Sequence, residues 1–409
     1  MSLRIRLQPW QCFSMDEHPE ARSIVETLAK AGFVAYYAGG WVRDFLLQKP
    51  SDDIDIATNA PPETVQALFP KTVPVGIAFG IVLVIVEGRQ YEVATFRNDF
   101  DYKDGRRPSR VEFTSAQEDA KRRDFTINGM FYDPLKQQVL DFVGGKQDLE
   151  RGVIRAIGNP HERIREDRLR MIRALRLSCR FGFVIEAETE AAIRAHANEL
   201  FPAVAIERVV QELEKGKACG KLPELLQKLG EFGLLTVIFP NVKQLYIKHF
   251  PLEAPLIVSL LELFPESSLD FQLSLCQRLK LSNSDQQFVS FLYQTKHHPP
   301  KDLSEWAHFY AHELSVLCVQ VLAVHESKHF LSEHQSRRQK LLPFIERIRQ
   351  HRPVVSSHDL MEMGIKPGKN LGVLLKEAER ISINEGIEDK KTVIQKLRSK
   401  GAISAPFNE

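Results

Sequence analysis

A change in sequence texture near residue 158 is the feature that most restricts how this chain can fold. Before it, β-branched runs and glycine turns alternate with short segments of helical spacing. Beyond it, apolar residues recur almost throughout at three- and four-residue spacing, the period of an amphipathic helix. The pattern therefore predicts an α+β head, with helices around a mixed sheet, followed by an all-helical remainder.

Segments within the first part support this division. Residues 80–88 and 90–97 are two β-branched runs that meet at Gly88 and Arg89, which predicts a hairpin. Residues 21–31 and 61–69 have helical spacing, and the second begins with proline and carries an acid in its first turn.

Composition narrows the class of protein. A chain of 409 residues predicts two to four domains, and a net charge of +2 means that any attraction to nucleic acid must come from local charge. Its 5 cysteines form no CxxC pair, which favours reduced thiols in a cytoplasmic protein. The first residues lack an apolar signal region and no apolar run approaches roughly 18 residues, so neither secretion nor a membrane partner is expected.

Gly39 and Gly40 lie between a predicted strand and a predicted helix. Glycines there let the backbone approach a ligand closely, and the N–H groups of a helix start can face phosphate. Arg43 and Asp44 follow in the first helical turn, with Arg43 within reach of a phosphate oxygen. A tight turn without a ligand is the alternative.

Asp53 and Asp55 are two residues apart in a β-prone run, so both carboxylates should leave the same face of a strand. Two close negative charges need a cation, and hard oxygen ligands suit Mg²⁺. The alternative is a solvated acidic loop, but the nearby glycine turn favours metal and triphosphate together. Glu92, in the second hairpin strand, is a candidate third ligand or else an ordinary edge-strand acid.

The stretch 121–129 is dense in polar groups that suit a nucleotide. Arg122 and Arg123 offer guanidinium forks for triphosphate oxygens, whereas Asp124 and Asn128 suit ribose hydroxyls. A charged helix start is the alternative.

A second polar group lies in the arginine-rich stretch 160–180, which we expect to be one helix. Asp167 and Arg170 would project from one face, and Glu166 would hold the Arg170 guanidinium. Asp accepts and Arg donates, which matches the amine and ring nitrogen of cytosine and adenine but mispairs with uracil and guanine. The pair therefore predicts a template for C and A, although a surface ion pair is the alternative. Further along, Arg173, Arg176 and Arg180 could meet phosphates or RNA.

Together, the motifs "GGWVRDFLL…DDIDIAT", "RRDFTINGMFYDP" and "EDRLRMIRALR" resemble the class II tRNA nucleotidyltransferase and bacterial poly(A) polymerase family of the polymerase β superfamily. Similarity is expected from about residue 30 to 245 and more weakly beyond. Two departures are Gly129, where the family usually has alanine, and Leu177, where it usually has phenylalanine.

The resemblance implies a role for each matching residue. Gly39, Gly40, Arg43 and Asp44 would cradle the triphosphate, and Asp53 and Asp55 would bind two Mg²⁺ ions. Asp124 and Asn128 would select the ribose, with Arg122 and Arg123 nearby. Glu166, Asp167 and Arg170 would select the base. It also implies four domains: a catalytic head (1–140), a base-recognising neck (141–215), an RNA-binding body (216–340) and a tRNA-binding tail (341–409). The expected activity is addition of CMP and AMP to the tRNA 3′ end from CTP and ATP.

Other activities share these motifs. An A-adding tRNA nucleotidyltransferase and a poly(A) polymerase are the alternatives within the family, and a catalytically inactive RNA-binding protein is one outside it. Residues 96–113 resemble the flexible loop needed for adenine addition, and residues 75–84 and 364–380 resemble the tRNA-specific branch. The HESKH stretch at 325–329 matches a zinc-protease pattern, but a surface helix end is the preferred interpretation.

Overall fold

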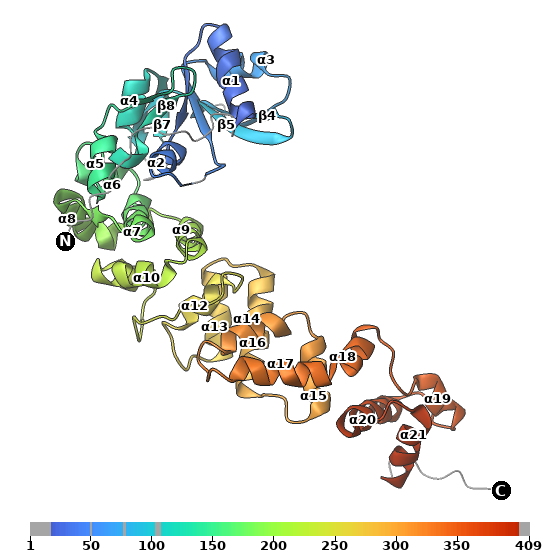
Figure 1. Ribbon diagram of the computed structural model, residues 1–409. Helices are drawn as coiled ribbons and strands as arrows, with labels where there is room; N and C mark the ends of the chain where they lie inside the picture. Colours follow the sequence, from blue (N-terminus) through green and yellow to red (C-terminus); the bar gives the residue numbers. More distant parts are fainter. Residues whose placement is uncertain (1–17, 50, 77–78, 103–107, 401–409) are drawn as a thin grey trace. The chain divides into compact units, whose positions relative to one another are not determined.

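The computed structural model describes residues 18–49, 51–76, 79–102 and 108–400. It divides into two compact units, Met1–Tyr246 and Ile247–Glu409, which we describe separately. The first contains a mixed sheet with helices and the second is helical, which confirms the predicted α+β head and helical remainder (Figure 1). The boundaries at 140, 215 and 340 stay a prediction.

Within the residues that the structure describes, the strands all lie in the first unit. They are β1 (Ala35–Ala38), β2 (Asp55–Thr58), β3 (Thr72–Gly76), β4 (Ile81–Val86), β5 (Arg89–Thr95), β6 (Arg97–Tyr102), β7 (Pro108–Phe113), β8 (Phe131–Asp133), β9 (Gln138–Leu140), β10 (Val153–Ile154) and β11 (Val184–Ile185).

The helices of the first unit are α1 (Pro19–Lys30), α2 (Gly40–Leu46), α3 (Pro62–Leu68), α4 (Ala116–Lys121), η2 (Thr126–Asn128), α5 (Gly145–Arg151), α6 (Pro160–Glu166), α7 (Leu169–Phe181), α8 (Ala187–His196), η3 (Ala197–Glu199), α9 (Ile206–Ala218), α10 (Leu222–Glu231) and α11 (Leu234–Ile238). Those of the second are α12 (Leu256–Leu261), α13 (Leu269–Arg278), α14 (Asn283–His297), α15 (Leu303–Ala311), α16 (Ser315–Leu322), α17 (Phe330–Lys340), α18 (Leu342–Arg349), α19 (Ser357–Glu362), α20 (Lys369–Glu385) and α21 (Lys390–Ser399).

The main sheet has the strand order β3-β4-β5-β2-β1-β8-β9. Strands β2 and β5 run parallel, and the other neighbouring pairs are antiparallel. The predicted hairpin is confirmed: Val86 pairs with Arg89, and the two residues between them, Glu87 and Gly88, both have positive φ. A two-residue turn of this kind follows the natural twist of the paired strands.

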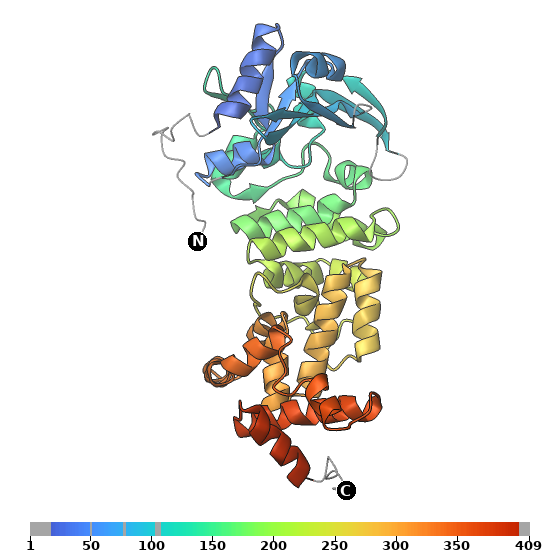
Figure 2. The same ribbon diagram turned by 90° about the vertical axis from the view of Figure 1, so that its right-hand side faces the viewer.

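Helices α1 and α3 pack against the sheet, and the turned view shows the blue helix α1 beside it (Figure 2). Ile24 and Leu28 of α1 are fully buried. A second cluster, which includes Ala57, Phe96 and Phe131, is buried with Ala120 of α4. The strands that carry the candidate site therefore have rigid cores behind them, which fixes their side chains.

The described part of the second unit contains further buried clusters, of which two join several helices. One joins α15, α16 and α18 through residues such as Tyr310, Cys318 and Ile345, and the other joins α19, α20 and α21 through residues such as Leu360 and Leu374. In the described part of the chain no helix is both long and apolar enough to cross a bilayer. Cys179, Cys219, Cys276 and Cys318 carry free thiols, and Cys12 lies outside the described residues.

The HESKH stretch does not form a helix. Residues 325–329 lie in turns between α16 and α17, and His325 pairs with Glu262 at 3.1 Å. The zinc-protease pattern requires its two histidines one helical turn apart on one face, so the sequence match has no structural counterpart here.

A buried histidine makes the second unit sensitive to pH. His334 is 8% exposed and its ring lies 2.9 Å from the Tyr310 hydroxyl. Burial lowers the pKa of His334, and the positive charge of Arg337 lowers it further. In the unfolded chain the pKa of this histidine is near 6.5, so as the pH falls its ring takes up a proton at a higher pH than in the folded protein. Stability is lost as the pH drops through that value.

We expect the free energy of unfolding of the second unit to fall between about pH 7.5 and about pH 5.5. Urea titrations followed by the fluorescence of Trp306, whose ring lies 5.2 Å from His334, measure this change. His334→Gln should flatten the pH dependence, whereas His308→Gln, at an exposed position on α15, should preserve it. An unchanged dependence in His334→Gln would contradict the assignment.

Candidate functional site

The paired glycines form the turn between β1 and α2. Gly39 has φ 69° and ψ −135°, a combination that residues with a side chain avoid. A Cβ atom on Gly39 would lie 3.4 Å from Arg123 Nη1 and 3.5 Å from Asp55 Oδ2. The turn thus brings together three segments that were predicted separately.

Arg43 and Asp44 lie beneath this turn, and each is 4% exposed. Arg43 donates to Asp44 Oδ1 at 2.9 Å and to Asn128 Oδ1 at 2.6 Å, and its guanidinium lies over the Phe181 ring. Burial lowers the pKa of Arg43, an effect that Asp44 opposes. Asp44 also accepts from Arg180 at 3.0 Å. Two predicted groups, Arg43 and Asn128, are therefore in direct contact.

Asp55 is the first residue of β2, whereas Asp53 lies in the loop before the strand, so the predicted strand begins later than expected. Asp53 and Asp55 are exposed, whereas the following Ile56 is fully buried. Strand β2 pairs in parallel with β5, with Ile56 opposite Val93. Asp55 and Glu92, one residue earlier on each strand, are consequently neighbours on the same face.

The three carboxylates repel one another. The protein around Asp55 raises its pKa to about 6, first through desolvation and then through the charges of Glu92 and Asp53, while Arg123 opposes the rise. The pKa of Glu92 is raised as well, mainly by desolvation. A divalent cation would relieve this repulsion, so the donor set fits Mg²⁺. Among the described residues, however, no three acidic, His or Cys side chains already surround one cation position.

Both predicted arginines of the second motif are held by one buried acid. Asp119, which is 1% exposed, accepts from Arg122 Nη2 at 2.7 Å and from Arg123 Nη2 at 3.0 Å. Burial alone would raise the pKa of Asp119, but the two guanidinium groups outweigh it and hold the pKa below its usual value. Asp119 was not among the residues predicted from the sequence, although its spacing of three and four residues from the arginines was a usable signal.

The predicted ribose-binding residues are also in contact. Asp124 accepts from Asn128 Nδ2 at 3.1 Å and from Arg173 Nη1 at 3.0 Å. Burial would raise the pKa of Asp124, but Arg173 outweighs it and the net shift is downward. Because Arg173 lies on α7, this ion pair links Asp124 to the helix that also carries Arg170.

The arginine-rich stretch is not one helix, and that prediction is wrong. Helix α6 ends at Glu166, Asp167 is extended with φ −146° and ψ 101°, and α7 begins at Leu169. The cause is local, because the Asp167 carboxylate accepts the Leu169 N–H at 3.1 Å, which forms a turn just before α7 begins. The contact between Glu166 and Arg170 is present as predicted, at 2.7 Å.

Asp167 is therefore not paired with Arg170. Its two oxygens accept from Arg208, at 3.1 Å and 2.8 Å, an arginine that was not among the predicted site residues. The other arginines of α7 also meet carboxylates: Arg176 is buried against Glu212 and Arg180 pairs with Asp44.

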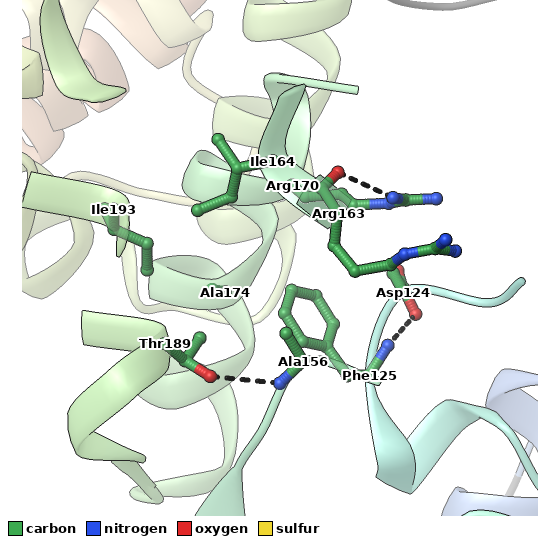
Figure 3. A pocket seen from close by; sticks show the side chains of 9 residues that line it. All are labelled: Asp124, Phe125, Ala156, Arg163, Ile164, Arg170, Ala174, Thr189 and Ile193. Atoms are coloured by element: carbon green, nitrogen blue, oxygen red, sulfur yellow. Dashed lines mark hydrogen bonds between the residues drawn. The ribbon is translucent and has the colours of Figure 1, made fainter. Parts of the chain in front are cut away.

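A small pocket is lined by Asp124 and by residues of α6, α7 and α8, and Asp167 is not among its lining residues (Figure 3). Asp124, Arg163 and Arg170 lie on one side of it in the close-up view, and Ile193 on α8 lies on the other. The remaining lining residues are Phe125, Ala156, Ile164, Ala174 and Thr189. The pocket has room for about one water molecule, so it does not by itself accommodate a base.

Gly129 has a packing reason in this chain. A Cβ atom there would lie 2.7 Å from Val143 Cγ2 and 3.0 Å from Ile157 Cδ1. Alanine at this position would require one of these side chains to move, which explains the departure from the family pattern.

Family models match most of the chain. The model "Poly A polymerase head domain" matches residues 35–155, and "Probable RNA and SrmB- binding site of polymerase A" matches residues 182–245. A model for domain 2 of tRNA nucleotidyltransferases matches residues 261–397. The similarity therefore extends well beyond residue 245.

Related proteins and solved structures agree with these matches. The chain is 36% identical over 407 residues to a CCA-adding enzyme of Enterococcus faecalis, covering 94% of this chain and 98% of that one. It is 35% identical to a CCA-adding enzyme of Pediococcus pentosaceus, covering 92% and 96%. The structure of a Bacillus stearothermophilus CCA-adding enzyme in complex with CTP superposes with a TM-score of 0.79 at 29% identity, covering 94% and 98%.

The repulsion at Asp55 can be measured directly. Because Glu92 and Asp53 both raise the pKa of Asp55, Glu92→Gln should lower it in metal-free protein. Carboxyl-labelled aspartate followed by ¹³C NMR gives the midpoint, with Asp55→Asn assigning the signal. As a control, Glu87→Gln, in the exposed turn between β4 and β5, should leave the midpoint in place. An unchanged midpoint in Glu92→Gln would show that the two carboxylates are not coupled.

Proposed function

The chain belongs to the family of class II CCA-adding tRNA nucleotidyltransferases and bacterial poly(A) polymerases, and we propose that it adds CMP and AMP to the tRNA 3′ end from CTP and ATP. The observation that carries the proposal is a chain of contacts from the glycine turn to the arginine-rich helices: Arg43 donates to Asn128, Asn128 donates to Asp124, and Asp124 accepts from Arg173 of α7. Near full-length similarity to proteins named CCA-adding enzymes supports the choice of activity within the family. Because the substrate is tRNA, we also expect a cytoplasmic protein.

In this proposal the triphosphate lies along the glycine turn. Gly39 and Gly40 let it approach the backbone, and Arg123 faces the same turn. Arg43 and Asp44 complete the cradle from below by fixing the turn and Asn128. Arg122 adds positive charge beside Arg123, since Asp119 anchors both.

Asp53 and Asp55 would hold Mg²⁺, with Glu92 as a further candidate ligand. When bound, the metal supplies activation of the RNA 3′-hydroxyl and stabilisation of the pyrophosphate leaving group, which nucleotidyl transfer requires. The residues fit this role because their mutual repulsion already raises the pKa of Asp55 in the protein alone. Protein side chains then have mainly to position the reacting groups.

Base selection follows from the chemistry of the two template groups. Asp167 accepts from the exocyclic amine shared by cytosine and adenine, and Arg170 donates to the adjacent ring nitrogen. Uracil and guanine would place a carbonyl against the carboxylate and an N–H against the guanidinium. Asp124 and Asn128 would take the ribose hydroxyls, because they contact each other and are fixed by Arg173 and Arg43.

The alternatives within the family differ in what they add. Two of the three sequence segments that favoured the CCA activity, 96–113 and 75–84, include residues 103–107 and 77–78, which lie outside the described residues. An A-adding enzyme and a poly(A) polymerase therefore remain outcomes of the test rather than separate proposals.

We expect full CCA synthesis on a tRNA that ends before the CCA sequence when CTP and ATP are both present. The measurement is gel resolution of products from three tRNAs, ending before CCA, after one C and after CC, with either nucleotide or both. Addition of only A to the CC-ended tRNA would indicate an A-adding enzyme. Long A tracts on any RNA would indicate a poly(A) polymerase.

Asp53→Ala with Asp55→Ala should lower incorporation by at least about a thousandfold, since metal-assisted charge stabilisation contributes several kcal/mol to phosphoryl transfer. RNA affinity, measured by filter binding, should change little. Asp52→Ala is a matched control, because Asp52 is exposed in the same loop. RNA extension by the double variant would mean that the metal assignment is wrong.

A further inference from the structure

Arg123 directs one donor nitrogen at the glycine turn. A Cβ atom on Gly39 would lie 3.4 Å from Arg123 Nη1, so this nitrogen faces the place proposed for the triphosphate. Within the described residues no protein acceptor binds Nη1, although the side chain is only 19% exposed. A largely buried cationic donor without an acceptor points to an anionic ligand. Nucleotide binding then depends on what holds Nη1 in this direction.

Asp119 holds the opposite edge of the guanidinium. Its Oδ2 accepts from Arg123 Nε at 3.2 Å and from Arg123 Nη2 at 3.0 Å. Two bonds along one edge of a planar guanidinium leave Nη1 pointing away from the acid. The centroid of the Phe131 ring lies 4.8 Å from the guanidinium carbon, so the ring covers one face of the same group. These contacts fix both the direction and the plane of the Arg123 fork.

The neighbouring arginine binds the same acid in the same way. Asp119 Oδ1 accepts from Arg122 Nε at 2.9 Å and from Arg122 Nη2 at 2.7 Å. It also accepts the N–H of Arg97, the first residue of β6, at 3.1 Å. Five donors thus share a carboxylate that has about four lone-pair sites. Asp119 has no capacity left for a nucleotide or a metal, so it can act only through the groups that it holds.

Asp119 is itself carried by a rigid element. It lies on α4 and is 1% exposed, and the next residue, Ala120, is fully buried in the cluster that includes Phe96 and Phe131. The bond from the Arg97 N–H ties it to the start of β6 as well. An acid fixed in this way can set the direction of both arginine forks.

We propose that Asp119 is a positioning residue for the nucleotide triphosphate, because it holds Arg122 and Arg123 by one edge and so directs Arg123 Nη1 at the glycine turn. This inference rests on the function proposed above, in which the triphosphate lies at that turn. Removing the carboxylate would let the guanidinium groups rotate while their charge stays in place. Affinity for the triphosphate should then fall, whereas contacts to the base and the ribose should persist.

The test compares Asp119→Asn with wild-type protein. Asparagine has the same shape, but its amide N–H₂ would face a guanidinium, so at least one arginine loses its anchor. Competition with a fluorescent CTP analogue in the presence of Mg²⁺ gives Kd for CTP and for CMP. Affinity for CTP should fall at least about tenfold, because charge-assisted hydrogen bonds are lost, and affinity for CMP should change little. A general structural defect would weaken the binding of both nucleotides alike.

The control is Glu118→Gln. Glu118 precedes Asp119 on α4 and pairs with Lys121 at 2.8 Å on the protein surface, so its loss should leave the ratio of the two Kd values unchanged. Thermal unfolding of each variant checks the fold. If Asp119→Asn does not fold, Asp119→Glu carries the same expected result, because it keeps the charge but moves the carboxylate by one methylene group.

Kinetics and a combined variant separate positioning from other roles. In Asp119→Asn the KM for CTP should rise, whereas the KM for tRNA should stay near its wild-type value. In protein that already carries Arg122→Met and Arg123→Met, adding Asp119→Asn should not weaken CTP binding further, because no arginine remains to be positioned.

Three results would each overturn the inference. They are wild-type affinity for CTP in Asp119→Asn, equal losses of affinity for CTP and CMP, and a further loss of CTP affinity in the combined variant. A wild-type protein that neither binds CTP nor extends tRNA would contradict the proposed function as well. Unchanged CTP binding by Asp119→Asn in an otherwise active enzyme overturns this inference alone.

Discussion

Carboxylate–guanidinium pairing inside the protein determines where the candidate functional groups lie. Asp119 holds the arginines of the second motif, Asp44 joins Arg43 to Arg180, and Asp124 is tied to Arg173 of α7. Removing such charges from water costs free energy. This cost is offset only when the ion-pair geometry is good and further hydrogen bonds are formed. Their value here is positional, because they link the strand-rich part of the first unit to the helices that carry the base-selecting groups.

This pairing also explains how a nearly neutral chain can contain an arginine-rich stretch. A net charge of +2 seemed at odds with an arginine-rich stretch at 160–180. Arg163, Arg168 and Arg170 meet acids in the structure, and so do the arginines of α7, several of them buried or half-buried. The stretch is better understood as an internal scaffold than as a general surface for nucleic acid.

Much of this arrangement could be predicted from the sequence, because local patterns carry it. The alternation of acidic and apolar residues in β2 predicted that Asp55 and the buried Ile56 would point to opposite faces of the strand. The glycine turn at Gly88 predicted the hairpin. The break at Asp167 could not be predicted, because the residue spacing of the stretch 160–180 fits a continuous helix. The hydrogen bond from the Leu169 N–H to the Asp167 carboxylate favours the break instead. Arg208 was missed for a different reason: it lies 41 residues from Asp167, a separation that no local period reports.

The tight space at Gly129 has a consequence for how such chains diverge. A methyl group there collides first with Val143, a residue in a separate segment. A descendant that acquires alanine at 129 would first need a smaller or displaced residue at 143. If alanine came first, the intermediate protein would be overpacked at this point. The two positions should therefore covary among relatives, and the order of the two substitutions along a lineage should be constrained in one direction.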